Sequence, residues 1–320
     1  MIIRHPVASL VVSGRPFTAA EAAVGTVDVR LASGGEHDSA RLVLWSTSRA
    51  AGASTGDRIA IALGERGDVV DVWAGTVVRA ERADGQVVLD ALAHTAPLSR
   101  ERRAQAWQDQ TVADIVRDLV GAVAIEEVDA SLQLPWFAVD TQRSVWSHLR
   151  DLAHLVGAEL GSSPNGAVRF VPVAASRNVH TLRYGAELVR WKLADHDITP
   201  ARGASAYGAA SEAGAQQWHW LMGAGGGNSG GGSAPALAGV LRTRDAADAV
   251  AKGRAERQQR RTRQGLLLAV GTPAIRPGDG VSLTSVPGVP DARYRVRTVH
   301  HRLDGRLGMS TTLTVEGAAA

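Results

Sequence analysis

The sequence predicts a mainly β protein, with two related β-barrel domains and a small α+β insert between them. The first observation is a β-meander that occurs twice. One copy runs from Gly56-Asp57 to about residue 92, and the other runs from Gly278-Asp279 to Val315. In each copy an Asp-Gly pair separates two alternating apolar runs, a strong hairpin signal because glycine tolerates the positive φ of a tight turn. The repetition indicates related β domains near the two ends of the chain.

The second observation is a change of hydrophobic period between these β regions. Thr111 predicts a helix start with a capping box, because its hydroxyl can accept a bond from the backbone three residues on while Asp114 reaches back. A second helix is expected from Ser144, with one apolar stripe at helical spacing. Gly157 or Gly161 ends it. The two helices and the strands near them predict the α+β insert.

We therefore divide the chain into three parts. Residues 1–97 form the first barrel from about six strands, enough for a small barrel. Residues 98–175 form the α+β insert, and residues 176–320 form the second barrel. Within the second barrel, the glycine- and serine-rich residues 222–235 indicate a flexible loop. A helix rich in arginine is expected at about 245–264.

The composition is that of an ordinary soluble globular protein. The chain has 320 residues, of which 45% are hydrophobic and 21% charged, enough for two or three domains. Cysteine is absent, which excludes disulfides, thiolate nucleophiles and cysteine-based zinc sites. There is no apolar run of about 18 residues, so we expect no membrane partner and no secretory signal. Arginine supplies nearly all the positive charge, which fits protein interfaces or simply the nucleotide composition of the source.

Three segments resemble those of a known family. Trp107–Val116 is similar to a helix start of the pattern Thr-Val-x-Asp-Ile, and Ser144–Gly157 to a helix with an aromatic residue near its start, here Trp146 where Phe is usual. Pro277–Thr311 resembles paired Pro-Gly-Asp and Tyr-x-Val-x-x-Val-x-His signatures. These segments resemble the baseplate hub proteins of contractile phage tails and injection systems: the late-control D family, the hub part of type VI spike proteins and the T4-like hub.

The resemblance implies two tube-like β-barrel domains joined by the insert, in a structural protein that is not an enzyme and needs no cofactor. It implies a homotrimer whose six barrels join a sixfold tail tube to a threefold spike. The implied partners are the inner tail-tube protein, a separate central spike protein and other baseplate subunits. The protein would be made and assembled in the bacterial cytoplasm as part of a phage tail or injection particle. The sequence ends at Gly317-Ala-Ala-Ala without a needle-like repeat, so we expect the spike on another chain.

Candidate partner contacts come from arginines and tryptophans near the glycine-rich segment. The arginine-rich helix could be a solvated face, a contact with acidic surfaces of a neighbouring tail subunit, or a phosphate contact with nucleic acid. No aromatics interleave with the arginines, so sequence-specific or stacked nucleic-acid binding is not expected. Trp218 and Trp220 could be interface anchors or core residues. The candidate contacts are Arg254, Arg257, Arg260, Arg261, Trp218 and Trp220.

No sequence motif indicates catalysis or metal binding. The glycine run matches nucleophile-elbow and dinucleotide strings but lacks the required strand and helix around it. His300 and His301 would point to opposite faces of one strand, so they cannot chelate one ion. Asp195-His196-Asp197 is expected in a solvated loop.

The rival hypothesis is a tail-associated cell-wall hydrolase or a carbohydrate-binding module of the two-barrel type. Paired carboxylates would serve glycoside hydrolysis, and Glu126-Glu127 is the most obvious pair. Adjacent acids on a strand diverge, so we interpret this pair as surface. Two acids lining one cleft would favour the rival.

Overall fold

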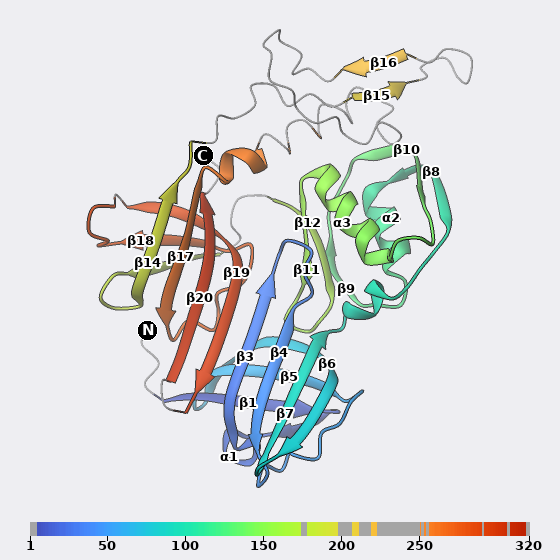
Figure 1. Cartoon of the computed structure of the whole chain (residues 1–320). Helices are drawn as coiled ribbons and strands as arrows, with labels where there is room; N and C mark the ends of the chain where they lie inside the picture. Colours follow the sequence, from blue (N-terminus) through green and yellow to red (C-terminus); the bar gives the residue numbers. More distant parts are fainter. Residues whose placement is uncertain are drawn as a thin grey trace.

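The computed structural model confirms a mainly β fold with a small α+β insert (Figure 1). It describes residues 5–173, 178–197, 207–210, 219–222, 250, 253, 256–289, 291–305 and 308–317, with only the backbone of 207–210 and 219–222. None of the helices in these ranges has the length and apolar character needed to cross a membrane.

The first barrel is built from six antiparallel strands. Its order is β1 (Pro6–Val12), β5 (Arg58–Glu65), β6 (Asp68–Ala83), β7 (Gln86–Ala93), β4 (Ser39–Trp45) and β3 (Val24–Ala32), with the short β2 (Arg15–Phe17) on β1. The alternating Ile59, Ile61 and Leu63 of β5 are buried, as a strand with one inward face requires. The sheet curls, so that β1 and β5 lie behind β3 and β4 (Figure 1).

The second barrel repeats this strand order. It reads β13 (Val179–Arg183), β18 (Gly280–Thr284), β19 (Ala292–Asp304), β20 (Gly308–Gly317), β17 (Arg263–Val270) and β14 (Leu188–Asp195). The predicted duplicated meander is confirmed as β5-β6-β7 and β18-β19-β20. One pairing differs, because β13 is parallel to β18 whereas β1 is antiparallel to β5.

The two barrels are continuous with each other. Strand β3 of the first barrel pairs antiparallel with β19 of the second, which joins both barrels into one 13-stranded sheet. A single cluster of buried apolar side chains, including Ile61 and Leu313, extends through both. The structure therefore adds a junction that the sequence pattern did not predict.

The insert has a core of its own. Its elements are η1 (Ala96–Ser99), β8 (Gln105–Thr111), α2 (Val112–Val120), β9 (Ile125–Val128), β10 (Gln133–Val139), α3 (Val145–Val156), β11 (Ala158–Ser162) and β12 (Val168–Pro172). As predicted, Ser144 caps the second helix and Gly157 ends it, at a φ of +70° that favours glycine. A further hairpin consists of β15 (Tyr207–Ala210) and β16 (His219–Met222).

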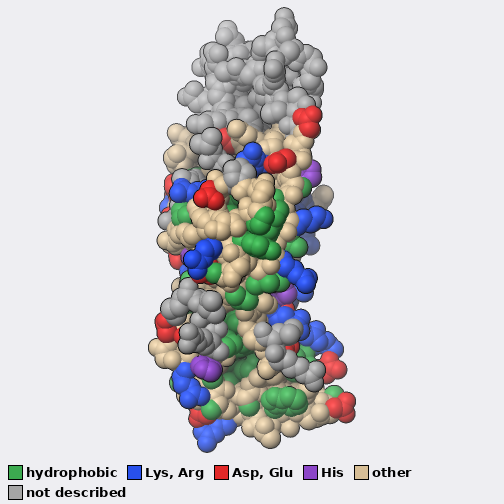
Figure 2. Space-filling view, turned by 90° about the vertical axis from the view of Figure 1, so that its left-hand side faces the viewer, with side chains coloured by type: hydrophobic (Ala, Val, Ile, Leu, Met, Phe, Trp, Pro, Cys, Tyr) green, Lys and Arg blue, Asp and Glu red, His purple; other side chains and the backbone are tan. Residues whose placement is uncertain are grey.

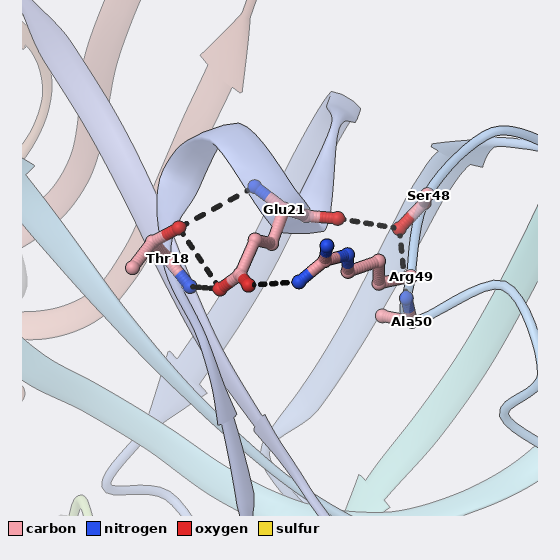
Figure 3. Close-up of polar contacts among 5 residues, drawn as sticks. All are labelled: Thr18, Glu21, Ser48, Arg49 and Ala50. Atoms are coloured by element: carbon pink, nitrogen blue, oxygen red, sulfur yellow. Dashed lines mark hydrogen bonds and ion pairs between the residues drawn. The ribbon is translucent and has the colours of Figure 1, made fainter.

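The capping box predicted at Thr111 is only half formed. The Asp114 amide donates to the Thr111 hydroxyl at 3.2 Å, but the Asp114 carboxylate accepts from that same hydroxyl, at 2.6 Å, and not from the Thr111 backbone. A full capping box lies instead at α1 (Ala19–Ala22), between Thr18 and Glu21 (Figure 3). Arg49 extends it with a 2.6 Å ion pair to the Glu21 carboxylate.

The predicted arginine-rich helix is shorter at its C-terminal end than expected. Residues 256–260 are helical, but Arg263 already begins β17, where Gln264 pairs with Glu316 of β20. The apolar alternation of β17 completes the second barrel, and this tertiary pairing overrides helical propensity. Residues 245–249 of the predicted helix and residues 223–235 of the predicted loop lie outside the described residues.

Candidate functional site

The candidate site is built from a corner that precedes the meander in each barrel. In the first barrel, Gly56 adopts a φ of +93° and donates its N–H to the Val77 carbonyl at 2.9 Å. The Val77 N–H donates back to the Asp57 carbonyl at 2.9 Å, while the Asp57 carboxylate accepts the Ser54 N–H at 2.8 Å. The corner thereby fixes where the long strand β6 leaves β5.

The corner of the second barrel has the same bonds. Gly278 also has a φ of +93° and donates to the Val296 carbonyl at 2.8 Å. Val296 donates back to the Asp279 carbonyl at 2.8 Å, and the Asp279 carboxylate accepts the Arg276 N–H at 3.0 Å. These matching bonds make Val77 and Val296 equivalent positions of the two barrels.

A β-bulge follows each of these positions and redirects the long strand. The extra residue is Val78 in β6 and Arg297 in β19. Before the bulge, each long strand pairs with the preceding strand of its meander. Beyond the bulge, residues 79–83 and 298–304 no longer pair with that preceding strand, because a bulge bends the long strand away from its first partner.

In the second barrel this edge is occupied within the chain. Residues 298–304 pair antiparallel with residues 32–26 of β3. Outside the barrel, His300 Nε2 contacts the Asp28 carboxylate across the two strands. His301 points inward and is fully buried, with Nδ1 at 2.9 Å from the Thr311 hydroxyl, and burial lowers its pKa to about 4. The predicted opposite orientation of the two histidines is confirmed.

In the first barrel the equivalent edge is open. Residues 79–83 pair with β7 on one side, and no described strand pairs with them on the other. The same holds for β14 at one end of the sheet, which pairs with β17 alone among the described strands. An unpaired strand edge presents a row of backbone donors and acceptors that can accept another strand.

The face around β14 also carries exposed apolar side chains. Tyr184, which bridges to Leu188 of β14, Val189 of β14 and Leu266, which pairs with Lys192, are all exposed. Figure 2 shows this side of the molecule, where apolar side chains lie among basic and acidic ones. Such a mixed surface next to an open strand edge is suited to a protein partner.

A cavity of about 200 Å³ lies where the two barrels and the insert meet. Its charged side chains are those of Asp38, Glu126, Glu127, Asp129, Glu159, Asp279, Arg169, Arg276 and Arg295. Several acids therefore share one cavity, and Glu126 and Glu127 line it from the surface, since Glu126 is exposed and Glu127 is half-buried.

Most of these carboxylates are already engaged. Glu159 forms a two-point pair with Arg295, at 3.0 and 2.8 Å, and both side chains are buried. Glu126 lies 3.5 Å from Arg169. Burial raises the pKa of Asp38 to about 8, and its carboxyl accepts the Ala32 N–H at 2.8 Å. This arrangement holds three parts of the chain together rather than leaving a carboxylate pair open to a substrate.

The predicted contact residues fall into two groups. Arg257 and Arg261 line a hollow beside α3, together with Arg150 and Arg297, and their predicted partner contacts stay predictions. Arg260 is only 4% exposed and lies 3.6 Å from Glu316, so its side chain is not on the surface of the single chain. Trp220 lies in β16, whereas Trp218 and Arg254 lie outside the described residues.

Sequence reasoning did not find the open edges or the β3–β19 junction. Counting from the two Gly-Asp pairs would not have matched residues 79–83 with 298–302, because Val77 lies 21 positions after Gly56 whereas Val296 lies 18 after Gly278. In the part of the chain that the structure describes, no group of three His, Cys, Asp or Glu residues could hold a metal ion.

The comparisons with known proteins agree on the fold. The chain superposes on a tail protein from Neisseria meningitidis MC58 with a TM-score of 0.69 and 15% identity, covering 98% of this chain and 96% of that one. For the 43 kDa tail protein of prophage MuSo2 from Shewanella oneidensis, the TM-score is 0.66 at 13% identity, with 97% and 98% coverage.

A third similar structure is an E. coli component of the type VI secretion system, itself described as similar to T4 bacteriophage tail proteins. Its TM-score is 0.61 at 13% identity, over 93% of this chain and 74% of that one. No protein-family model and no curated protein sequence matches the chain. At these identities the likeness establishes a shared fold.

Proposed function

We propose that the protein is a structural baseplate hub, which as a homotrimer joins a sixfold tail tube to a threefold central spike. The particle would be a phage tail or a contractile injection system, assembled in the bacterial cytoplasm. Support comes from the fold, which this chain shares over nearly its whole length with two tail proteins, one of them from a prophage, and with a secretion-system component.

The observation that carries the proposal is that equivalent strand edges of the two barrels differ: one is paired within the chain and the other is open. The chain already joins its first barrel to its second through β3 and β19. Among the described strands, β14 of the second barrel, at one end of the sheet, and residues 79–83 of β6 in the first barrel each lack a partner along one edge. A subunit with two different complementary surfaces associates head to tail, and it closes into a ring when the rotation permits.

The internal repeat explains how one ring can meet two symmetries. Each chain contributes two barrels of the same strand order, so three chains present six similar modules to a sixfold tube. Each chain contributes only one insert, with its own core, so the same ring presents three inserts to a threefold spike. The proposed mechanism is mechanical: the ring nucleates the tube, seats the spike and lines the channel.

The rival hydrolase hypothesis has one supporting feature, the acids of the three-way cavity. The arginine pairs hold Glu159 and Glu126 in place, and Asp38 is only 2% exposed, so it cannot reach a polysaccharide strand. A general acid must lie within hydrogen-bond reach of the leaving oxygen. We therefore expect no turnover of purified peptidoglycan, and measurable turnover lost in Glu159→Gln would favour the rival.

The test of the proposal is co-assembly. The protein is co-expressed with the spike and tube candidates encoded beside it, and complexes are purified through a tag on the hub. The expected result is a complex of three hubs with a spike trimer, which then binds tube protein in rings of six. A hub that remains a single chain and binds neither candidate would contradict the proposed function.

A further inference from the structure

We infer that β14 of one copy pairs antiparallel with residues 79–83 of β6 in a second copy, in the register that β3 adopts on β19. This inference rests on the proposed ring, and it names the contacting residues. In this register, Lys192 of one copy lies beside Glu81 of the next.

The register follows from equivalent positions in the two barrels. Val77 and Val296 are equivalent by their corner bonds, and they lie opposite Ala91 of β7 and Val315 of β20. The next strands place Ala40 opposite Ala91, and Gly265 opposite Val315. Ala40 and Gly265 are therefore equivalent.

One more step reaches the strands at the edge. Val29 of β3 lies opposite Ala40, and Leu193 of β14 lies opposite Gly265. Val29 and Leu193 are thus equivalent positions, and β14 takes the place in the second barrel that β3 takes in the first.

An independent feature confirms this alignment. The β3–β4 ladder has a bulge at Gly25, between the pairs made by Val24 and Thr26. The β14–β17 ladder has a bulge at Val189, between the pairs made by Leu188 and Arg190. Gly25 and Val189 both stand four residues before the aligned Val29 and Leu193, so the two strands match in their irregularity as well as in their order.

The known junction then supplies the register of the second one. On β19, His301 lies opposite Val29 and His300 lies opposite Arg30. Counting from Val77 and Val296, the equivalents of His300 and His301 are Glu81 and Arg82. Transferring the pairs puts Arg82 opposite Leu193, Glu81 opposite Ala194 and Ala83 opposite Lys192.

Charge complementarity supports this register. Inside the chain, His300 pairs directly with Arg30 of β3, but its side chain contacts Asp28, two residues away along β3. The same diagonal relation in the second junction joins Glu81 to Lys192. In the first junction the basic residue is on the long strand, and in the second junction the acidic residue is. Both pairs therefore join opposite charges, and long side chains can span this diagonal distance across a sheet.

Both side chains are accessible for such a pair. The Glu81 side chain is 50% exposed and pairs only locally with Arg79, two residues away on the same strand. Lys192 is exposed on β14 and is one of two lysines in the chain, the other being Lys252. The occupant of each edge is therefore a second copy of this chain.

The first test uses engineered cysteines, because the chain has none of its own. Glu81→Cys with Ala194→Cys places two thiols on directly opposite positions, within the Cα separation that a disulfide requires. Mild oxidation of the assembled protein should give covalent trimers on a non-reducing gel. The matched control, Arg79→Cys with Ala194→Cys, is two residues out of register and should give no covalent trimer.

The second test reverses the charges. Glu81→Lys and Lys192→Glu should each raise the protein concentration at half-dissociation of the ring by about 3- to 10-fold, and the double variant should restore it. If rings form but neither rescue nor in-register cross-linking occurs, this register is wrong while the hub function stands. If the unchanged protein forms no ring, alone or with the spike, the proposed function fails first.

Discussion

The two Gly-Asp corners have the same backbone and different surroundings. Gly56 has no atom within 4 Å of where a Cβ would lie, and the Asp57 carboxylate is largely in solvent. Gly278 lies against Glu159 and Arg295, and Asp279 is only 4% exposed beside His180. The local sequence thus determines the backbone of both corners. Only the second corner also contacts the insert, through Glu159.

The long strands differ in the same way. Beyond its bulge, β19 is covered by β3, and Val299 and His301 are buried. Their equivalents in β6, Ala80 and Arg82, remain partly or fully exposed. One chain therefore contains a paired and an unpaired form of equivalent strand edges.

The largest expected effect is at the covered corner. Glu159→Gln should lower the free energy of unfolding by about 3–5 kcal/mol, because it leaves buried Arg295 without its carboxylate. Urea unfolding measures this. The control Arg117→Gln breaks an exposed pair with Asp114 and should cost under about 1 kcal/mol. Equal losses would mean that the cavity pair does not hold the three parts together.

The two glycines offer a direct comparison. Gly56→Ala should cost about 1–2 kcal/mol, the strain of a side chain at positive φ. Gly278→Ala carries the same strain and also places a methyl group 3.1 Å from the Glu159 carboxylate, so about 2–4 kcal/mol is expected. Denaturant midpoints of the two variants provide the measurement. If Gly56→Ala lost more unfolding free energy than Gly278→Ala, the surroundings of the two corners would not explain their stability.

Asp38 should make stability depend on pH. Its folded pKa of about 8 lies above the ordinary value of 3.8, so the folded state holds the proton more tightly. The free energy of unfolding therefore falls as pH rises from about 4 to about 8. Asp38→Asn removes this slope and should stabilise the protein by about 1–3 kcal/mol at pH 8.5, with little gain near pH 4.

Urea unfolding of both proteins at pH 4.5, 6.5 and 8.5 checks this expectation. A difference between them that stays constant with pH would contradict the assignment of a protonated Asp38.

The smallest effect is expected at the exposed corner. The Ser54 N–H, and next the Ser13 hydroxyl, lower the pKa of Asp57, so its contribution is present above about pH 4 and is lost as pH falls. Solvent screens this group, so Asp57→Asn should cost under about 1 kcal/mol at pH 7. Thermal melts at pH 7 and pH 3 check this. If Asp57→Asn lowered the melting temperature more than Asp279→Asn does, the exposed corner would matter more than the buried one, contrary to expectation.

What the sequence could predict follows from the range of the interactions. The Asp-Gly hairpin turn between β6 and β7, the cap at Ser144 and the helix end at Gly157 depend on neighbouring residues, and these predictions were confirmed. The prediction of a full capping box at Thr111 was wrong, because the Asp114 carboxylate accepts from the Thr111 hydroxyl and not from its backbone N–H. The longer Glu21 side chain does reach the backbone N–H of Thr18.

The interactions that sequence reasoning missed join distant parts of the chain. The β3–β19 ladder connects residues more than 260 positions apart, and Arg260 is buried by packing against β20. The acids of the three-way cavity come from both barrels and the insert. Hydrophobic periodicity predicts that a segment is a strand, but it does not predict which distant strand pairs with its other edge. The open edges of the candidate interface could therefore be found only from the structure.

The most direct test of the account is the mass of the purified protein in solution, measured by light scattering alone and with the spike candidate. A hub of the proposed kind forms a ring of three 33.5 kDa chains, about 100 kDa, either alone or in the complex with the spike. A single chain at every concentration, unchanged by the spike, would contradict it.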